Sequence, residues 1–140
     1  MNAQLLEEWR RCVGADETII NLGDVAHPDA WRDEDRVAAI RDCPGRRVLV
    51  IGNHDEHELD VLAAAGFEEQ CRLALTATEP PLALSHEPLR RIPPGAVNVH
   101  GHVHDGTEAT ARHINLTVEQ TDYAPIRLSE VLAEARERGR

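Results

Sequence analysis

Four short segments of the sequence carry residues that could do chemistry, and they are built from histidine, aspartate, asparagine and glycine. They are Gly23–Asp24, the run "GNHD" at 52–55, Ser85–His86, and the run "HGHVH" at 100–104. Neutral imidazole and carboxylate together form the ligand set of manganese, iron, nickel and zinc. These segments therefore predict a site for a divalent metal ion.

The four segments differ in how strongly they predict such a site. A lone glycine–aspartate pair after a strand is usually an ordinary turn. "GNHD" is more informative, because four polar or glycine residues directly after an apolar run are hard to explain by packing. "HGHVH" is the strongest evidence for a metal site, since period-two spacing puts His102 and His104 on the same side of an extended segment. His100 is not assigned a ligand role.

The elements that must position these residues are apolar strands, because each segment ends an apolar run. The runs are "IINLGD", "VLVIGNHD", "LALSH" and "VNVHGHVH". In α/β proteins, ligands bind at the carboxyl ends of such strands. Gly23, Gly52 and Gly101 each stand just before a candidate ligand, where glycine lets the backbone turn and approach closely.

The rest of the chain supplies helices and a hairpin. Apolar spacing predicts helices over 2–14, 29–43, 57–67 and 129–138, with Ser129 as the N-cap of the last. Two β-type runs flank Glu79–Pro80–Pro81 and predict a hairpin. Helices and strands alternate in the first half, whereas strands dominate the second, which favours a mixed α/β sandwich with helices on the outer faces of the sheets.

Composition narrows the class of protein and of partner. The chain has 140 residues, 41% of them hydrophobic and 29% charged, which is typical of one folded domain. A net charge of −10 opposes binding to long nucleic acid or to anionic membrane. No apolar run is long enough to span a bilayer, and the first residues lack a signal-peptide pattern. Three scattered cysteines without a CxxC pair indicate reduced thiols, so a cytoplasmic location is expected.

Taken together and in this order, the four segments resemble motif blocks of the calcineurin-like metallophosphoesterase superfamily, whose pattern runs DxH, GDxx, GNH(D/E), H and GHxH. The matching stretches are "GDVA" at 23–26, "GNHD" at 52–55, "SHEP" at 85–88 and "GHVH" at 101–104. The stretch 113–132 also resembles the ending of small bacterial and phage members. The resemblance implies one metallophosphoesterase domain over 1–140 with that superfamily's fold, a sandwich of two mixed β-sheets flanked by helices, here short by its first strand.

Carried over position by position, the resemblance implies a centre for two metal ions. Asp24 would bridge them, and His104 would bind the first ion beside it. The protein ligands of the second ion would be completed by Asn53, His86 and His102.

The resemblance also implies the acid of the reaction. His54 would protonate the leaving group, and Asp55 would orient His54. Asn53 and His54 would contact the substrate.

The superfamily's first block, DxH, has no counterpart ahead of Asp24. Three explanations stay open: the natural protein begins further upstream, the chain is short and binds one ion, or a neighbour such as His27 substitutes. A sheet lacking that strand would have unpaired backbone groups. A homo-oligomer that supplies a strand from another chain is one remedy.

The expected function is metal-dependent hydrolysis of phosphodiesters or small phosphomonoesters by a metal-activated water, with no covalent intermediate. The cofactor would be Mn²⁺, with iron, zinc or nickel as alternatives: two ions if the site is complete, one otherwise. The alternative function is a catalytically impaired metallophosphoesterase relative that serves as a binding module.

Overall fold

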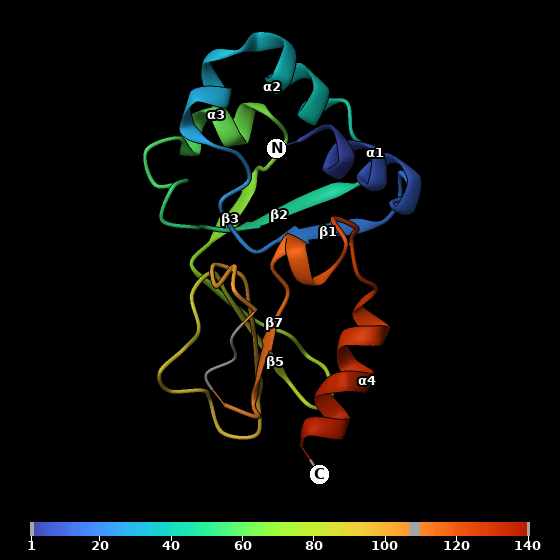
Figure 1. The fold of residues 1–140 in the computed structure, drawn as a ribbon, viewed down its shortest axis with the longest axis vertical. Helices are drawn as coiled ribbons and strands as arrows, with labels where there is room; N and C mark the ends of the chain where they lie inside the picture. Colours follow the sequence, from blue (N-terminus) through green and yellow to red (C-terminus); the bar gives the residue numbers. More distant parts are fainter. Residues whose placement is uncertain (1, 107–109, 140) are drawn as a thin grey trace.

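The computed structural model describes residues 2–106 and 110–139, which fold into two small sheets with helices around them (Figure 1). The first half contains α1 (Ala3–Cys12), β1 (Thr18–Asn21), η1 (Pro28–Arg32), α2 (Glu34–Arg41), β2 (Arg46–Val50), α3 (Leu59–Ala64) and β3 (Glu69–Cys71). The second half contains β4 (Leu73–Leu75), β5 (Leu82–Ser85), β6 (Val97–His100), β7 (His113–Asn115), η2 (Val118–Gln120) and α4 (Leu128–Arg138).

The first sheet has the order β1-β2-β3, and all its strands are parallel. Helices α1, α2 and α3 lie together above it in Figure 1. Their buried side chains form one core with the sheet, in which Trp9 of α1 contacts Phe67 edge-to-face with ring centroids 6.1 Å apart. Arg47 of β2 lies against the same indole, and burial lowers the pKa of its guanidinium. Trp9 and Phe67 are thus part of the core between the helices and the first sheet.

The second sheet has the order β4-β5-β6-β7, in which only the β4–β5 pair is antiparallel. Its apolar side chains pack with Val131 and Ala135 of α4 and with Val50 of β2. Every residue of β5, β6 and β7 is buried. Parallel strands buried on both faces have continuous apolar runs rather than alternation, as in "LAL" of β5.

The predicted sandwich of two mixed sheets flanked by helices, the calcineurin-like fold, was wrong. The first sheet is wholly parallel, and the second is parallel except at β4–β5. The described residues form a small α/β protein with parallel sheets and four α-helices. Three of these helices pack on the first sheet and only α4 on the second core. The physical reason is connectivity, since parallel neighbours need crossover connections and only β4 and β5 are joined by a hairpin.

Several local predictions also differ from the structure. The single helix expected over 29–43 is divided at Asp33, whose carboxylate accepts from the backbone N–H groups of Asp35 and Arg36 and begins α2 there. α4 begins at Leu128 with Arg127 as its N-cap, so Ser129 lies inside the first turn. The hairpin around residues 79–81 is confirmed by the antiparallel β4–β5 pair.

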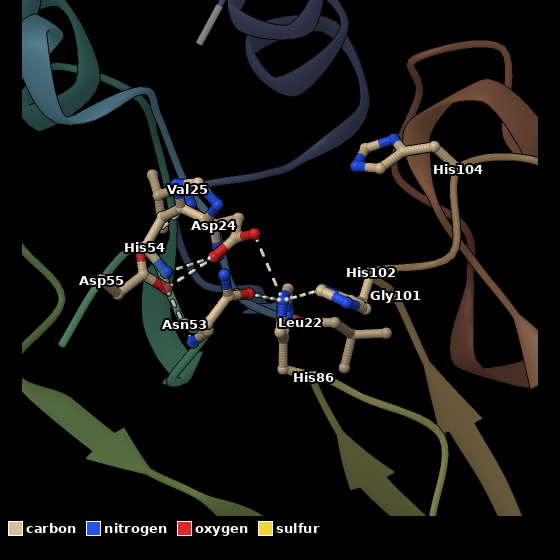
Figure 2. A network of polar contacts seen from close by, with 12 residues as sticks. Leu22, Asp24, Val25, Asn53, His54, Asp55, His86, Gly101, His102 and His104 are labelled. Carbon is tan, nitrogen blue, oxygen red and sulfur yellow. Dashed lines mark hydrogen bonds and ion pairs between the residues drawn. The ribbon is translucent and has the colours of Figure 1, made fainter.

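The fold brings the ends of four strands to one place. Asp24 follows β1, residues 52–55 follow β2, His86 follows β5, and Gly101–His102 follow β6. Hydrogen bonds link these four segments to one another, which confirms that the carboxyl ends of the strands gather the polar residues (Figure 2). Among residues 2–106 and 110–139, no helix is long and apolar enough to cross a membrane.

Candidate metal centre

Four side chains converge on one point at the strand ends. The Nε2 atom of His86 lies 3.0 Å from Oδ1 of Asn53, 3.0 Å from Nδ1 of His102 and 3.2 Å from Oδ2 of Asp24. Asp24, His86 and His102 offer ligand atoms that all lie within 4.8 Å of one another. We call Asp24, Asn53, His86 and His102 the strand-end cluster (Figure 2).

The other ring nitrogen of His86 fixes what its Nε2 atom can do. Nδ1 lies 2.7 Å from the carbonyl oxygen of Leu22, which can only accept, so Nδ1 carries a proton. In the neutral imidazole, Nε2 then presents a lone pair, and it faces a carboxylate that has only lone pairs to offer. A second proton on His86 would relieve the conflict with one partner, whereas a cation would satisfy all four atoms together. A ring N–H held by a backbone carbonyl is the usual support of a metal-binding histidine.

The distances also suit a cation. Ligand atoms about 2.1 Å from an octahedral ion lie about 3.0 Å from one another along the octahedron's edges. The separations of 3.0, 3.0 and 3.2 Å around the His86 Nε2 atom have that size. Two imidazoles, one carboxylate and one amide oxygen are a ligand set for manganese, iron, nickel or zinc. The residues therefore fit one divalent ion.

Two glycines allow the strand ends to come this close. A methyl group on Gly23 would lie 2.5 Å from Nδ1 of His86, and one on Gly52 would lie 2.3 Å from Oδ1 of Asp24. Both distances are far below van der Waals contact, so the predicted role of these glycines in close approach is confirmed. A methyl group on Gly101 would meet only ordinary contacts, the nearest at 3.5 Å, so the role predicted for that glycine was wrong.

Two members of the strand-end cluster have strained backbones. Asp24 has a φ of 53° and His102 a φ of 63°, in the left-handed region that L residues other than glycine rarely adopt. Each such residue costs about 1–2 kcal/mol. The rest of the structure must hold these conformations, as is common where a site is organised for binding.

Asp55 supplies part of that support. Its carboxylate is fully buried and accepts from the backbone N–H groups of Asp24, Val25 and Gly52, at 2.7, 3.2 and 2.8 Å. Burial raises the pKa of this carboxyl, against the opposing effect of the three N–H donors. Asp55 therefore joins the loop after β1 to the loop after β2. This differs from its predicted role of orienting His54, because both carboxylate oxygens are engaged by backbone groups.

Asn53 of the strand-end cluster and the adjacent His54 are both exposed to solvent. The backbone N–H of His54 donates to Oδ1 of Asp24 at 3.0 Å, which fixes the loop. Within the described part of the chain, the His54 imidazole makes no hydrogen bond, so it is free to meet a ligand. Asn53 instead directs its side chain into the cluster.

His104 does not join the strand-end cluster. Its Nδ1 atom lies 3.0 and 3.1 Å from the two carboxylate oxygens of Glu119 on η2, and Figure 2 shows its ring apart from Asp24. Burial disfavours the ionised Glu119, but its own backbone N–H and His104 more than compensate and lower the pKa of the carboxyl. We call His104 and Glu119 the outer pair. Among the described residues, one group of three side chains could hold a metal ion, Asp24, His86 and His102, and His104 is not part of it.

His27, the predicted substitute for a missing ligand, is exposed, and its Nδ1 atom accepts from the backbone N–H of Asp29 at 3.3 Å. His100 is fully buried, with its ring edge-to-face against His113 of β7 at 5.7 Å. It is a core residue, in agreement with its exclusion from the ligands.

Two polar partners of predicted site residues were missed by the sequence analysis. The Leu22 carbonyl, which orients His86, leaves no signal in a side-chain pattern. Glu119 lies in the C-terminal stretch that carries the resemblance, but a single exposed glutamate does not stand out among 25 acidic residues.

Comparisons with known proteins give a likeness in fold but no function. No family model matches the chain. A stretch of 54 residues, 39% of the chain, is 37% identical to the "Gene 66 protein" of Mycobacterium phage L5, of which it spans only 26%. The crystal structure of the "Protein of Unknown Function AQ665" from Aquifex aeolicus is similar with a TM-score of 0.71 and 24% identity, over 94% of this chain and 84% of that one. This likeness shows the fold alone.

Proposed function

We propose that this protein hydrolyses phosphate esters, either phosphodiesters or small phosphomonoesters, with one divalent metal ion held by Asp24, Asn53, His86 and His102. Mn²⁺ is the ion we expect, with iron, zinc and nickel as alternatives. The observation that carries the proposal is the convergence of Asn53 Oδ1, His102 Nδ1 and Asp24 Oδ2 on Nε2 of His86, at 3.0, 3.0 and 3.2 Å. The resemblance of the four sequence blocks to metallophosphoesterases supports it.

The reaction class follows from what the site contains. A divalent ion bound there would polarise a phosphoryl oxygen and lower the pKa of a coordinated water. Ser85, next to His86 in the sequence, is buried, and its hydroxyl donates to the backbone carbonyl of Glu87. The attack on phosphorus is therefore assigned to water. The Asp55 carboxylate holds both loops in place before the substrate arrives, so little reorganisation is needed during the reaction.

His54 is the residue we assign to the leaving group. It is exposed beside Asp24, its backbone is fixed by that carboxylate, and its imidazole is free. General acid catalysis by a positioned histidine contributes typically ~10²–10⁴-fold. Replacing His54 by alanine should slow methyl or alkyl phosphodiesters far more than nitrophenyl esters, whose leaving groups need no proton. Equal slowing of both classes would refute this role.

The proposal is tested by hydrolysis of bis(p-nitrophenyl) phosphate with added Mn²⁺. Wild type should show turnover that EDTA abolishes, and His102→Ala should show none while keeping the circular dichroism spectrum of wild type. His102 is exposed, so its removal should leave the core intact.

Two other results would each be informative. Turnover by His102→Ala equal to that of wild type would overturn the assignment of the site. Tight Mn²⁺ binding by a folded wild type without turnover of any ester would favour the alternative of a metal-holding binding module.

A further inference from the structure

An apolar groove opens directly beside the strand-end cluster. A cavity of about 1110 Å³ reaches from Asp24, His86 and His102 along β1 and between the two cores. Its apolar walls include Ile20, Leu84, Val99, Leu116, Ile126 and Leu128, and we call it the β1 groove. A phosphoryl group at the cluster would occupy only the polar end of this space.

The β1 groove concentrates exposed apolar side chains. Among the described residues, five large hydrophobic side chains are exposed, and three of them line the groove: Ile20 at 40%, Ile126 at 41% and Leu128 at 48%. Single exposed apolar residues are ordinary, but a gathered set beside a polar site marks a ligand surface. The groove runs beside Thr18–Leu22 for about 13 Å at roughly 3.3 Å per residue.

The β1 groove is lined by His104 but not by His54. His104 lines the groove, and Figure 2 shows His54 and His104 on opposite sides of Asp24 and His86. A phosphodiester bound at the cluster has two ester groups. If the leaving group departs next to His54, the retained ester group can point toward the groove.

We infer that the substrates are phosphodiesters whose retained ester group is apolar and elongated, an alkyl chain or aryl group that lies in the β1 groove. This inference rests on the proposed function. In the reaction, the water oxygen forms a bond to phosphorus and gives up a proton to solvent. The bond between phosphorus and the leaving oxygen breaks, and the departing oxygen takes the electron pair and a proton from His54. The product is the apolar monoester and a free alcohol.

The test is a series of O-alkyl p-nitrophenyl phosphodiesters with methyl, butyl and octyl groups, hydrolysed by the Mn²⁺-loaded protein. The leaving group is constant, so differences in kcat/KM report on the alkyl group. Burial of a methylene favours binding by up to roughly fourfold, so the octyl ester should exceed the methyl ester at least tenfold. Replacing Ile20 by threonine should reduce that ratio. Leu75→Thr is the matched control, because Leu75 is 61% exposed on β4 and lies outside the groove.

The outcomes separate this inference from the proposed function. Turnover of the methyl ester without any rise toward the octyl ester would overturn the inference and leave the function standing. Absence of turnover across the whole series would overturn both. A flat series from a protein that sediments as a dimer would assign the groove to a second copy of the chain and would also overturn the inference. An equal drop of the octyl-to-methyl ratio in both threonine variants would count against the groove as its cause.

Discussion

The strand-end cluster and the outer pair draw on the same motif yet behave differently. His102 and His104 are two residues apart in "HGHVH", but His102 lies 3.0 Å from His86, whereas His104 pairs with Glu119. The difference comes from the backbone, because β6 ends at His100 and His102 has a φ of 63°. Alternation places side chains on one face only while the chain stays extended. The prediction that both histidines share one side was therefore wrong.

The two regions also differ in how firmly they are held. His86 is 6% exposed, and its Nδ1 is fixed by the Leu22 carbonyl, while Asp55 ties the neighbouring loops together. In the outer pair, the His104 side chain is 66% exposed and that of Glu119 is 39% exposed. Exposed ion pairs contribute little to folding stability, typically below ~1 kcal/mol. A preorganised site is therefore expected at the cluster and not at the outer pair.

The largest expected effect is on metal affinity. Loss of a residue that only supports a ligand weakens metal binding about 10–100-fold, so removing a ligand in His86→Ala should weaken Mn²⁺ binding more than 100-fold. His104→Ala should change it by less than about threefold. Isothermal titration calorimetry measures both. A loss of similar size in the two variants would place His104 in the metal site and erase the distinction between the regions.

The next effect is on thermal stability in the presence of metal. An ion that binds only the folded state at 100 times its Kd stabilises it by about 2.7 kcal/mol, a rise of several degrees in Tm. Wild type and Glu119→Gln should both show this rise with Mn²⁺, and EDTA should reverse it. His102→Ala should show none. Scanning calorimetry at matched free Mn²⁺ decides the matter, and a rise in His102→Ala equal to that in wild type would contradict the assignment.

A third effect concerns the support beneath the strand-end cluster. Asp55→Asn keeps the volume but replaces one acceptor oxygen by a donor that faces backbone N–H groups. A buried N–H left unpaired costs about 1–3 kcal/mol, so the variant should lose that much free energy of unfolding in urea. Asp16→Asn, at an exposed turn, is the control and should stay within about 0.5 kcal/mol of wild type. Wild-type stability of Asp55→Asn would show that Asp55 does not join the loops.

The smallest effect comes from relieving backbone strain. In His102→Gly the left-handed φ of 63° becomes easy to adopt, so the metal-free protein should gain up to about 1 kcal/mol even as it loses a ligand. His104→Gly is the matched comparison, because His104 has an ordinary φ and glycine there should bring no gain. Urea unfolding in EDTA measures both. Destabilisation of both variants alike would mean that no strain is stored at His102.

Part of this site was predictable from the sequence. Asp24, Asn53, His86 and His102 each end an apolar run, and this position at the ends of strands placed them together before any coordinates. Gly23 and Gly52 were recognisable for a related reason, since close approach of two backbones excludes a side chain. The position of His104 was not predictable, because it depends on one left-handed residue. The role of Asp55 was not predictable either, because its partners are backbone groups of another loop.

The sequence by itself determined which functional groups are available: imidazoles and carboxylates at the ends of buried apolar strands. It could do so because residue type and hydrophobic pattern are local properties. Only the tertiary structure decided which of these groups meet and how the sheets are built. The parallel strands are set by pairing between residues 15 to 28 positions apart, and Asp55 accepts from backbone groups of Asp24 and Val25, 31 and 30 positions away. Such contacts depend on the whole packed chain, and no local pattern encodes them.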